Sequence, residues 1–159
     1  MMRVAILTVS DSCAAQKRQD MSGQTIRGML PAERFEICEY RVVPDERSDI
    51  QNELIHFADE SKVDIVFTAG GTGLGPRDVT PEATAAVCDR MVPGLAEAIR
   101  QEGLKKTKNA MLSRAIAGVR QNTLIINLPG SPKAVKESLE VILDVLPHAM
   151  DMLQGKGHE

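Results

Sequence analysis

The sequence is poor in aromatic residues, cysteine and histidine. It has no Trp, one Tyr and three Phe, so it lacks the stacking surfaces with which proteins hold single-stranded nucleic acid. Its three cysteines, Cys13, Cys38 and Cys88, are too widely spaced for a disulfide framework or a zinc site. The three histidines form no Ser–His–Asp or metal-ligand pattern. We therefore expect reduced thiols with structural roles and chemistry that does not rest on histidine.

A basic surplus and long apolar segments are also missing. The 19 basic and 22 acidic side chains give a net charge of -3, which argues against nucleic acid or an anionic membrane as the main partner. The apolar run at residues 4–9 ends before Asp11 and is too short for a secretion signal or a membrane span. The expectation is a soluble cytoplasmic protein with a single domain over residues 1–159.

Short apolar segments alternate with helical patterns along the chain. Residues 4–9, 63–68 and 123–128 are continuous apolar runs typical of buried strands. Residues 35–43 alternate like a strand near an edge, and residues 10–20 are polar and predict a loop. This alternation predicts an α/β fold with a largely parallel sheet, whose ligands bind beyond the carboxyl ends of the strands.

Several helices carry start signals. Residues 48–51 read Ser-x-x-Gln, a capping-box pattern. Ser22, Thr80 and Ser131 are predicted N-caps, and Pro147 predicts a separate helix near the C-terminus. Thr80 and Ser131 each follow a loop at the end of a buried strand, so these loops lead into helix N-termini, where anions are stabilised.

The most informative motif is TAGGTGLGPRDVTPE, residues 68–82. Its closely spaced glycines permit positive φ and a close approach of the backbone, so successive N–H groups can cradle a phosphate. It is neither a Walker A loop nor a GxGxxG motif. A tight connection between strand and helix would account for the glycines alone. Arg77 and Asp78 favour a ligand site, because a carboxylate beside a phosphate requires a bridging cation such as Mg²⁺.

Other polar segments follow the predicted strands with less distinctive chemistry. Asp45 lies in an ordinary Pro-Asp turn and gains significance only if it meets Asp78 in space, where two carboxylates can share a metal. Ser10-Asp11 fits a ligand contact or a turn equally well. Ser113-Arg114 offers a guanidinium that either grips phosphate or lies on a solvated face.

Together these segments resemble a known family. ILTVSDSCA, QDMSG, VPDE, TAGGTGLGPRDVTPEAT, MLSRA and NLPGSPKAVKESLE, in this order, are similar to the MogA/MoaB family of molybdenum-cofactor biosynthesis proteins, to which the gephyrin G domain is related. The similarity runs from about residue 4 to residue 155, and the ends of the chain are closer to the MogA type. The sequence departs from the family pattern at residues 74–76 and at Gln19 and Met21, which flank Asp20.

The resemblance implies a fold, an assembly and a reaction. The fold is a three-layer α/β/α sandwich around a mixed, mostly parallel sheet with one antiparallel strand, and the assembly is a homotrimer. MogA-type members adenylylate molybdopterin: Mg-ATP and molybdopterin give molybdopterin-AMP and pyrophosphate, ahead of hand-over for molybdate insertion. By motif position, Asp45 and Asp78 correspond to the essential acidic pair, with Mg²⁺ as their metal.

The remaining predicted contacts are to molybdopterin and nucleotide. They are Ser10, Asp11, Ser22, Gly23, Gly70, Gly71, Thr72, Gly73, Arg77, Glu82, Ser113, Arg114, Asn127, Pro129, Gly130 and Ser131. Three alternatives stay open: a non-catalytic MoaB-type carrier of molybdopterin, an assembly scaffold, and an unrelated nucleotide-binding domain. The acidic pair argues against a pure binder, and the absence of further domains and of nucleotide-binding motifs weakens the other two.

Overall fold

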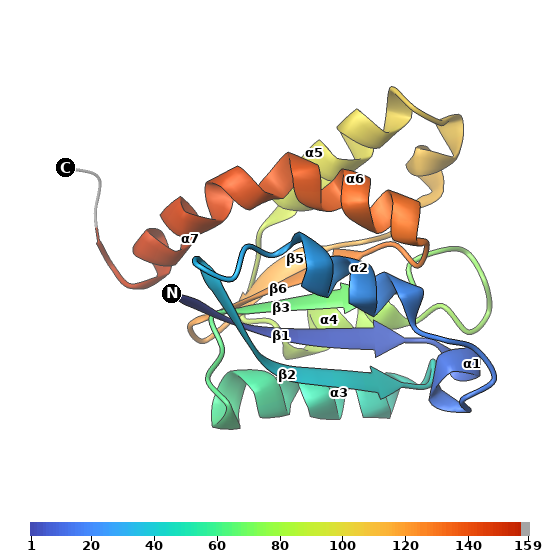
Figure 1. The fold of residues 1–159 in the computed structure, drawn as a ribbon, viewed down its shortest axis with the longest axis horizontal. Helices are drawn as coiled ribbons and strands as arrows, with labels where there is room; N and C mark the ends of the chain where they lie inside the picture. Colours follow the sequence, from blue (N-terminus) through green and yellow to red (C-terminus); the bar gives the residue numbers. More distant parts are fainter. Residues whose placement is uncertain (157–159) are drawn as a thin grey trace.

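A six-stranded sheet forms the centre of the molecule, and helices cover both of its faces (Figure 1). The computed structural model describes residues 1–156. The strands follow the spatial order β2-β1-β3-β6-β5-β4. Their bounds are β1 (Met2–Val9), β2 (Phe35–Val43), β3 (Ile65–Ala69), β4 (Arg90–Met91), β5 (Ala117–Arg120) and β6 (Thr123–Leu128).

The sheet is mixed, with one strand reversed. β1, β2, β3 and β6 are parallel to their neighbours among these four, whereas β5 is antiparallel to both β6 and β4. β2 lies at one edge, as its alternating pattern predicted, and the three apolar runs become the central strands β1, β3 and β6. The expected mixed, mostly parallel sheet is confirmed.

The helices divide into two layers. Their bounds are α1 (Asp11–Ala14), α2 (Met21–Met29), α3 (Arg47–Ile55), α4 (Thr80–Val87), α5 (Pro93–Leu104), α6 (Pro132–Ile142) and α7 (Leu146–Leu153), with a π-helical turn η1 (His56–Glu60) and 3-10 turns η2 (Lys108–Leu112) and η3 (Leu143–Val145). α2, α5, α6 and α7 cover one face, and α3 and α4 cover the other (Figure 1). No helix of the described residues has the length and apolar character that crossing a bilayer requires.

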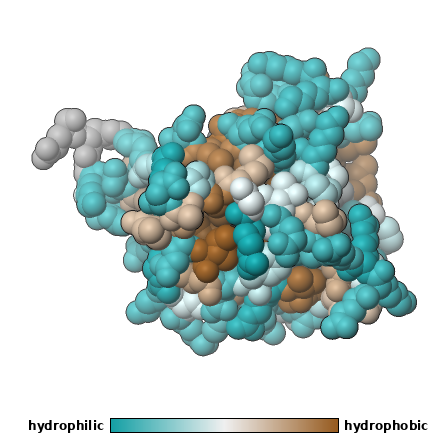
Figure 2. Space-filling model, viewed as in Figure 1, coloured by the Kyte–Doolittle hydropathy of each residue, from teal (hydrophilic) through white to brown (hydrophobic). Residues whose placement is uncertain are grey.

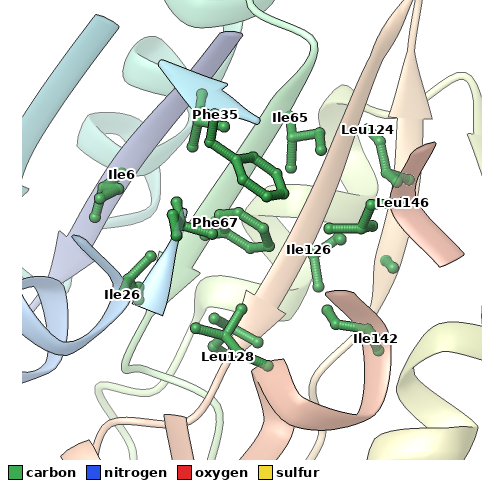
Figure 3. Close-up of a cluster of buried hydrophobic side chains, with 14 of the residues drawn as sticks. Ile6, Ile26, Phe35, Ile65, Phe67, Leu124, Ile126, Leu128, Ile142 and Leu146 are labelled. Carbon is green, nitrogen blue, oxygen red and sulfur yellow. The ribbon is translucent and has the colours of Figure 1, made fainter. Parts of the chain in front are cut away.

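The side chains of the central strands contribute alternately to two hydrophobic cores, because successive residues of a strand point to opposite faces of the sheet. Ile6, Phe67 and Ile126 pack with Ile26 of α2 and Ile142 of α6 (Figure 3). On the other face, α3 and α4 bury apolar residues against the remaining strand positions. Burial on both faces makes the three-layer sandwich. Figure 2 shows a largely hydrophilic outer surface with a few hydrophobic patches on the face viewed.

Two predictions on the N-terminal side are wrong, one of a loop and one of a helix start. The segment expected as a loop contains the short helix α1. α2 is capped by Asp20 rather than Ser22, because the Asp20 carboxylate accepts the N–H of Gly23 at 2.9 Å. The Ser22 hydroxyl instead donates to the carbonyl of Gly130, which lies in another loop. Local sequence cannot reveal that distant acceptor.

Two further cap predictions also fail. α3 begins after Glu46 and has no side-chain cap bond, so residues 48–51 do not form a capping box. Thr80 is the first residue of α4, and Val79 occupies the N-cap position. Ser131 does cap α6, accepting the N–H of Ala134 at 3.2 Å. Its helix ends at Ile142, and Pro147 lies in the first turn of the separate α7.

Candidate functional site

The loops that follow the parallel strands lie together at the carboxyl-terminal ends of these strands. Gly70 follows β3 and Gly130 follows β6, and a Cβ on Gly130 would lie only 3.5 Å from the Gly70 Cα. Ser10 follows β1 and donates its N–H to the carbonyl of Val43, at the end of β2, at 2.9 Å. As expected for a parallel sheet, four loops therefore lie together at the carboxyl-terminal ends of its strands.

A cavity of about 410 Å³ opens between these loops, and we call it the acidic cavity. It contains eight of the predicted contacts: Ser10, Ser22, Asp45, Gly70, Gly71, Asp78, Gly130 and Ser131. Cys13, Arg18 and Asp20 also line it. Residues predicted from five separate segments of the sequence thus share one concave surface.

Asp45 and Asp78 meet in this cavity. Burial raises the pKa of Asp45, the neighbouring carboxylates of Asp11 and Asp78 raise it further, and the Asp11 N–H bond offsets part of this increase. One Asp78 oxygen, Oδ2, accepts the N–H of Gly75 at 2.9 Å. Two carboxylates that repel each other at a polar cavity are a donor set that suits a divalent cation.

The residues present fit Mg²⁺ in a particular way. No cluster of three metal-ligating side chains of the kind that closes around an ion occurs within residues 1–156. Mg²⁺ keeps several waters and is usually held by one or two carboxylates together with substrate phosphates. Asp45 and Asp78 supply that number of carboxylates, so the site fits Mg²⁺ that arrives with a polyphosphate.

The glycine turn supplies the backbone beside the acids. Gly70 and Gly71 have φ values of 100° and 69°, which favour glycine. A Cβ on Gly71 would overlap Thr80 Oγ1 and lie 3.3 Å from Asp45 Oδ1. The missing side chain therefore lets the backbone pass directly between α4 and the acidic cavity.

A second cavity, of about 530 Å³, lies on the other side of this turn. We call it the apolar cavity, because its lining is mostly apolar. Four predicted contacts line it, namely Thr72, Gly73, Ser113 and Pro129. The rest of its wall comes from α5, η2, α6 and the segments that flank η2, and it includes Ile99, Arg100 and Lys106, which the sequence analysis did not single out. The segment from Gly70 to Gly73 thus separates two cavities.

Asn127 and Gly23 line neither cavity, and each has a role inside the protein. Asn127 is 1% exposed. Its side-chain amide donates to the hydroxyls of Thr68 and Thr84 at 3.0 Å each, and its oxygen accepts the N–H of Ile116 at 3.3 Å. All of its side-chain hydrogen-bonding groups have partners, so Asn127 joins β6 to its neighbours.

Gly23 is small for a packing reason. A Cβ at this position would overlap the Tyr40 hydroxyl and the Asp20 carboxylate. That carboxylate accepts hydrogen bonds from Tyr40 and, at 2.7 Å, from Thr8. Burial and Asp20 together raise the pKa of Tyr40. The spacing Asp20-x-x-Gly23 is the signal for this network, since it is that of an N-cap.

Arg77 binds protein carboxylates rather than facing either cavity. Its Nε and Nη2 donate to the two oxygens of Asp11 at 3.0 and 2.9 Å, and its Nη1 lies 2.9 Å from Glu46. This guanidinium lowers the pKa of Asp11. Asp11 and Asp45 also exchange backbone N–H to carboxylate bonds, at 2.9 and 3.0 Å. Asp11 and Arg77 therefore hold Asp45 in place from outside the cavity.

Arg114 is likewise committed within the protein. Its Nε donates to the carbonyl of Gly73 and its Nη2 to the carbonyl of Asp78, each at 2.7 Å, while Nη1 pairs with Glu82. Arg114 holds the pKa of Glu82 below its usual value. Neither Arg114 nor Glu82 lines either of the two cavities, and their predicted ligand contacts stay predictions.

Comparison with known proteins identifies relatives over almost the whole chain. Residues 5–148 match the family described as "Probable molybdopterin binding domain". Proteins named molybdopterin adenylyltransferase from Helicobacter pylori J99 and Escherichia coli K12 are 42% and 36% identical. These matches cover 96% of this chain and 88% of the first protein, and 97% of this chain and 86% of the second.

Solved structures agree in fold. The structure of a molybdopterin biosynthesis enzyme, MoaB, from Thermus thermophilus is 53% identical with a TM-score of 0.92, and the match covers 100% of both chains. A structure titled MogA is 44% identical with a TM-score of 0.89, covering 95% of this chain and 99% of the other. Similarity of this extent means that these proteins share one fold along almost their whole length.

Proposed function

The chain belongs to the MogA/MoaB family of molybdenum-cofactor biosynthesis proteins, and from this we propose that it is a molybdopterin adenylyltransferase. It transfers AMP from Mg-ATP to the terminal phosphate of molybdopterin and releases pyrophosphate. Support comes from relatives that carry this name at 36–42% identity over nearly their full length.

The observation that carries the proposal is the pair of cavities divided by the glycine turn. A two-substrate transfer requires two adjacent binding spaces with their reactive ends close together. Gly70 and Gly71 line the acidic cavity, and the next two residues, Thr72 and Gly73, line the apolar cavity. The acidic cavity also contains Asp45 and Asp78. The reactive phosphates of both substrates fit at this shared wall.

The reaction needs little proton transfer from the protein. The terminal phosphate of molybdopterin is already an anionic nucleophile, and it attacks the α-phosphorus of ATP while the bond to pyrophosphate breaks. The chain has to bring two polyanions together in line and reduce their repulsion. Backbone N–H groups of the glycine turn bind phosphate oxygens, and Asp45 and Asp78 hold Mg²⁺ when it is bound, which neutralises charge on the phosphates.

The family also supports proposals about the protein's setting. We propose one domain over residues 1–159, a homotrimer in the cytoplasm, and transfer of the adenylylated product to a molybdate-inserting partner. Size-exclusion chromatography with light scattering tests the trimer, since a monomer has a mass of 17.3 kDa. A monomeric protein with full activity would overturn that assembly.

The reaction is tested by measuring pyrophosphate release with fresh molybdopterin, ATP and Mg²⁺. We expect release that depends on molybdopterin, and a loss of about 100-fold or more in Asp78→Asn, because one electrostatic group at the reacting phosphates is removed. Asp144→Asn is the matched control, since Asp144 is exposed in η3 and lines neither cavity.

The two outcomes that contradict the proposal differ in meaning. Tight molybdopterin binding with no pyrophosphate from the wild type would favour the non-catalytic carrier. Near wild-type turnover of Asp78→Asn at saturating Mg²⁺ would be consistent with the proposed reaction but would contradict a role for Asp78 in it.

A further inference from the structure

Arg114 is bonded to both ends of the loop that carries Asp78. Its guanidinium donates to the carbonyls of Gly73 and Asp78, at 2.7 Å each, and to the carboxylate of Glu82 in α4. Its backbone N–H donates to the carbonyl of Thr72 at 2.9 Å. One side chain therefore sets the separation between residues 73 and 78 and anchors both to α4.

This contact set lies between the two cavities. Thr72 and Gly73 belong to the wall of the apolar cavity, and so does Ser113, which precedes Arg114 in the chain. Asp78 belongs to the wall of the acidic cavity. Arg114 itself is in neither lining, so it connects the two walls without contacting a ligand in either.

The other contacts of the loop do not hold both residue 73 and residue 78. The Thr80 N–H donates to the carbonyl of Gly71 at 3.1 Å, which lies outside residues 73–78. The bonds between Gly75 and Asp78, at 2.9 and 3.0 Å, are internal to the loop and move with it. Arg77 pairs with Asp11 from a side chain that is 53% exposed, where ion pairs contribute little because water and salt screen them. Arg114 is 34% exposed and forms two of its bonds with backbone carbonyls, whose positions define the loop.

We propose that Arg114 is a positioning residue for the adenylyl transfer: it holds Asp78 at the acidic cavity and fixes that carboxylate relative to the apolar cavity. This inference rests on the proposed function for its role in turnover. A planar guanidinium with fixed donor directions is needed, because three acceptors in three directions exceed what the single nitrogen of lysine reaches in one geometry.

Arg120 provides a matched control. Its Nε and Nη2 donate to Asp59 at 3.0 and 2.8 Å, and its Nη1 donates to the carbonyl of Val87 at 2.9 Å. It has the same number of guanidinium bonds as Arg114 and is 22% exposed. It lies at the end of β5 that pairs with the start of β6, whereas the cavities lie beyond the carboxyl-terminal end of β6. Arg120→Gln therefore reports the cost of losing a comparable arginine elsewhere.

The test compares Arg114→Gln, Arg114→Lys and Arg120→Gln in the full chain by two measurements. One is Mn²⁺ affinity in the presence of α,β-methylene-ATP, followed by electron paramagnetic resonance. The other is the Mg²⁺ dependence of kcat and KM in pyrophosphate release. We expect Arg114→Gln to weaken Mn²⁺ binding and lower kcat by about 10-fold or more, as for groups that orient metal ligands. KM for ATP should change much less, and Arg114→Lys should be intermediate.

Arg120→Gln is expected to keep Mn²⁺ affinity and kcat within about twofold while losing thermal stability comparable to Arg114→Gln. Equal behaviour of the two Gln variants in both measurements would overturn the proposal. Should Arg114→Gln fail to fold, Arg114→Lys decides, and wild-type Mn²⁺ affinity with wild-type kcat would overturn it. Mn²⁺ titration needs no molybdopterin, so it tests this inference separately from the proposed reaction. Absence of pyrophosphate release by the wild type would refute the proposed function. Unchanged Mn²⁺ affinity in the Arg114 variants would refute this inference.

Discussion

Replacing Gly70 by Ala tests the turn on which the site depends. Gly70 has a φ of 100°, and a Cβ there would overlap the carbonyl oxygen of Val9 at the end of β1. The unfavourable φ costs about 1–2 kcal/mol for a residue with a side chain. The overlap with a main-chain atom, which has no other rotamer to adopt, adds about 1–3 kcal/mol. The expected loss of about 2–5 kcal/mol is a large share of the roughly 5–15 kcal/mol that stabilises a typical domain.

The facing turn offers the control. A Cβ on Gly130 would have one neighbour within 4 Å, the Gly70 Cα, at an ordinary contact distance of 3.5 Å. Gly130 is not among the glycines with a positive φ. Gly130→Ala should therefore leave stability unchanged or raise it by up to about 1 kcal/mol, because alanine restricts the unfolded chain.

The assay is thermal unfolding of both variants beside the wild type, supported by urea titration. At about 2–4 °C per kcal/mol for a chain of this size, Gly70→Ala should lower Tm by about 4–20 °C. Equal Tm values for Gly70→Ala and Gly130→Ala would refute the reasoning. They would mean that residue 70 does not have the positive φ that brings the glycine turn beside the acids.

Two further predictions concern the charged groups. Asp45→Asn should unfold at or above the wild-type Tm at pH 7 while losing pyrophosphate release, because it removes a partly buried charge that Asp11 and Asp78 repel; a lower Tm would contradict this. The Arg120 guanidinium lowers the pKa of Asp59 in the folded protein, so this pair stabilises the fold above the unfolded pKa of about 4 and loses that effect as pH falls through the lowered pKa. Urea unfolding should therefore show Asp59→Asn less stable than wild type at pH 7, with a difference that shrinks as pH falls below about 4; a constant difference would exclude the ion pair as its cause.

The parts of the fold that depend on hydrophobic pattern were predictable. The apolar runs became β1, β3 and β6, because strands buried on both faces have no polar alternation. The reversed direction of β5 had no local signal and was expected only from the family resemblance. Residues 109–119 have no single periodicity, because they divide between η2 and β5, with an irregular connection from Ser113 to Ile116.

Within the site, the sequence predicted which loops lie together, but it did not predict which groups hydrogen-bond to one another. The order of strands in a parallel sheet determines which loops converge, and the predicted residues do gather around two cavities. Asn127, Arg77 and Arg114 were assigned to ligands from the motifs in which they lie, and Arg114 also because a guanidinium can bind phosphate. Their actual partners lie between 11 and 66 residues away in the sequence. No pattern within a short window encodes such contacts, so the fold was needed to separate groups that face a cavity from groups that hold its walls.

This separation explains how a pair of carboxylates persists at the proposed phosphate-binding site. Asp45 is held close to Asp78 although burial and mutual repulsion oppose its charge. The opposing forces are supplied from outside the cavity: Arg77 neutralises Asp11, which exchanges hydrogen bonds with Asp45, and Arg114 fixes the backbone of Asp78. If both arginines pointed inward, their charge would neutralise the acids directly and remove the need for a metal. Because they bind the walls instead, neither arginine neutralises the acids directly, and the pair keeps the negative charge that the proposed Mg²⁺ site requires.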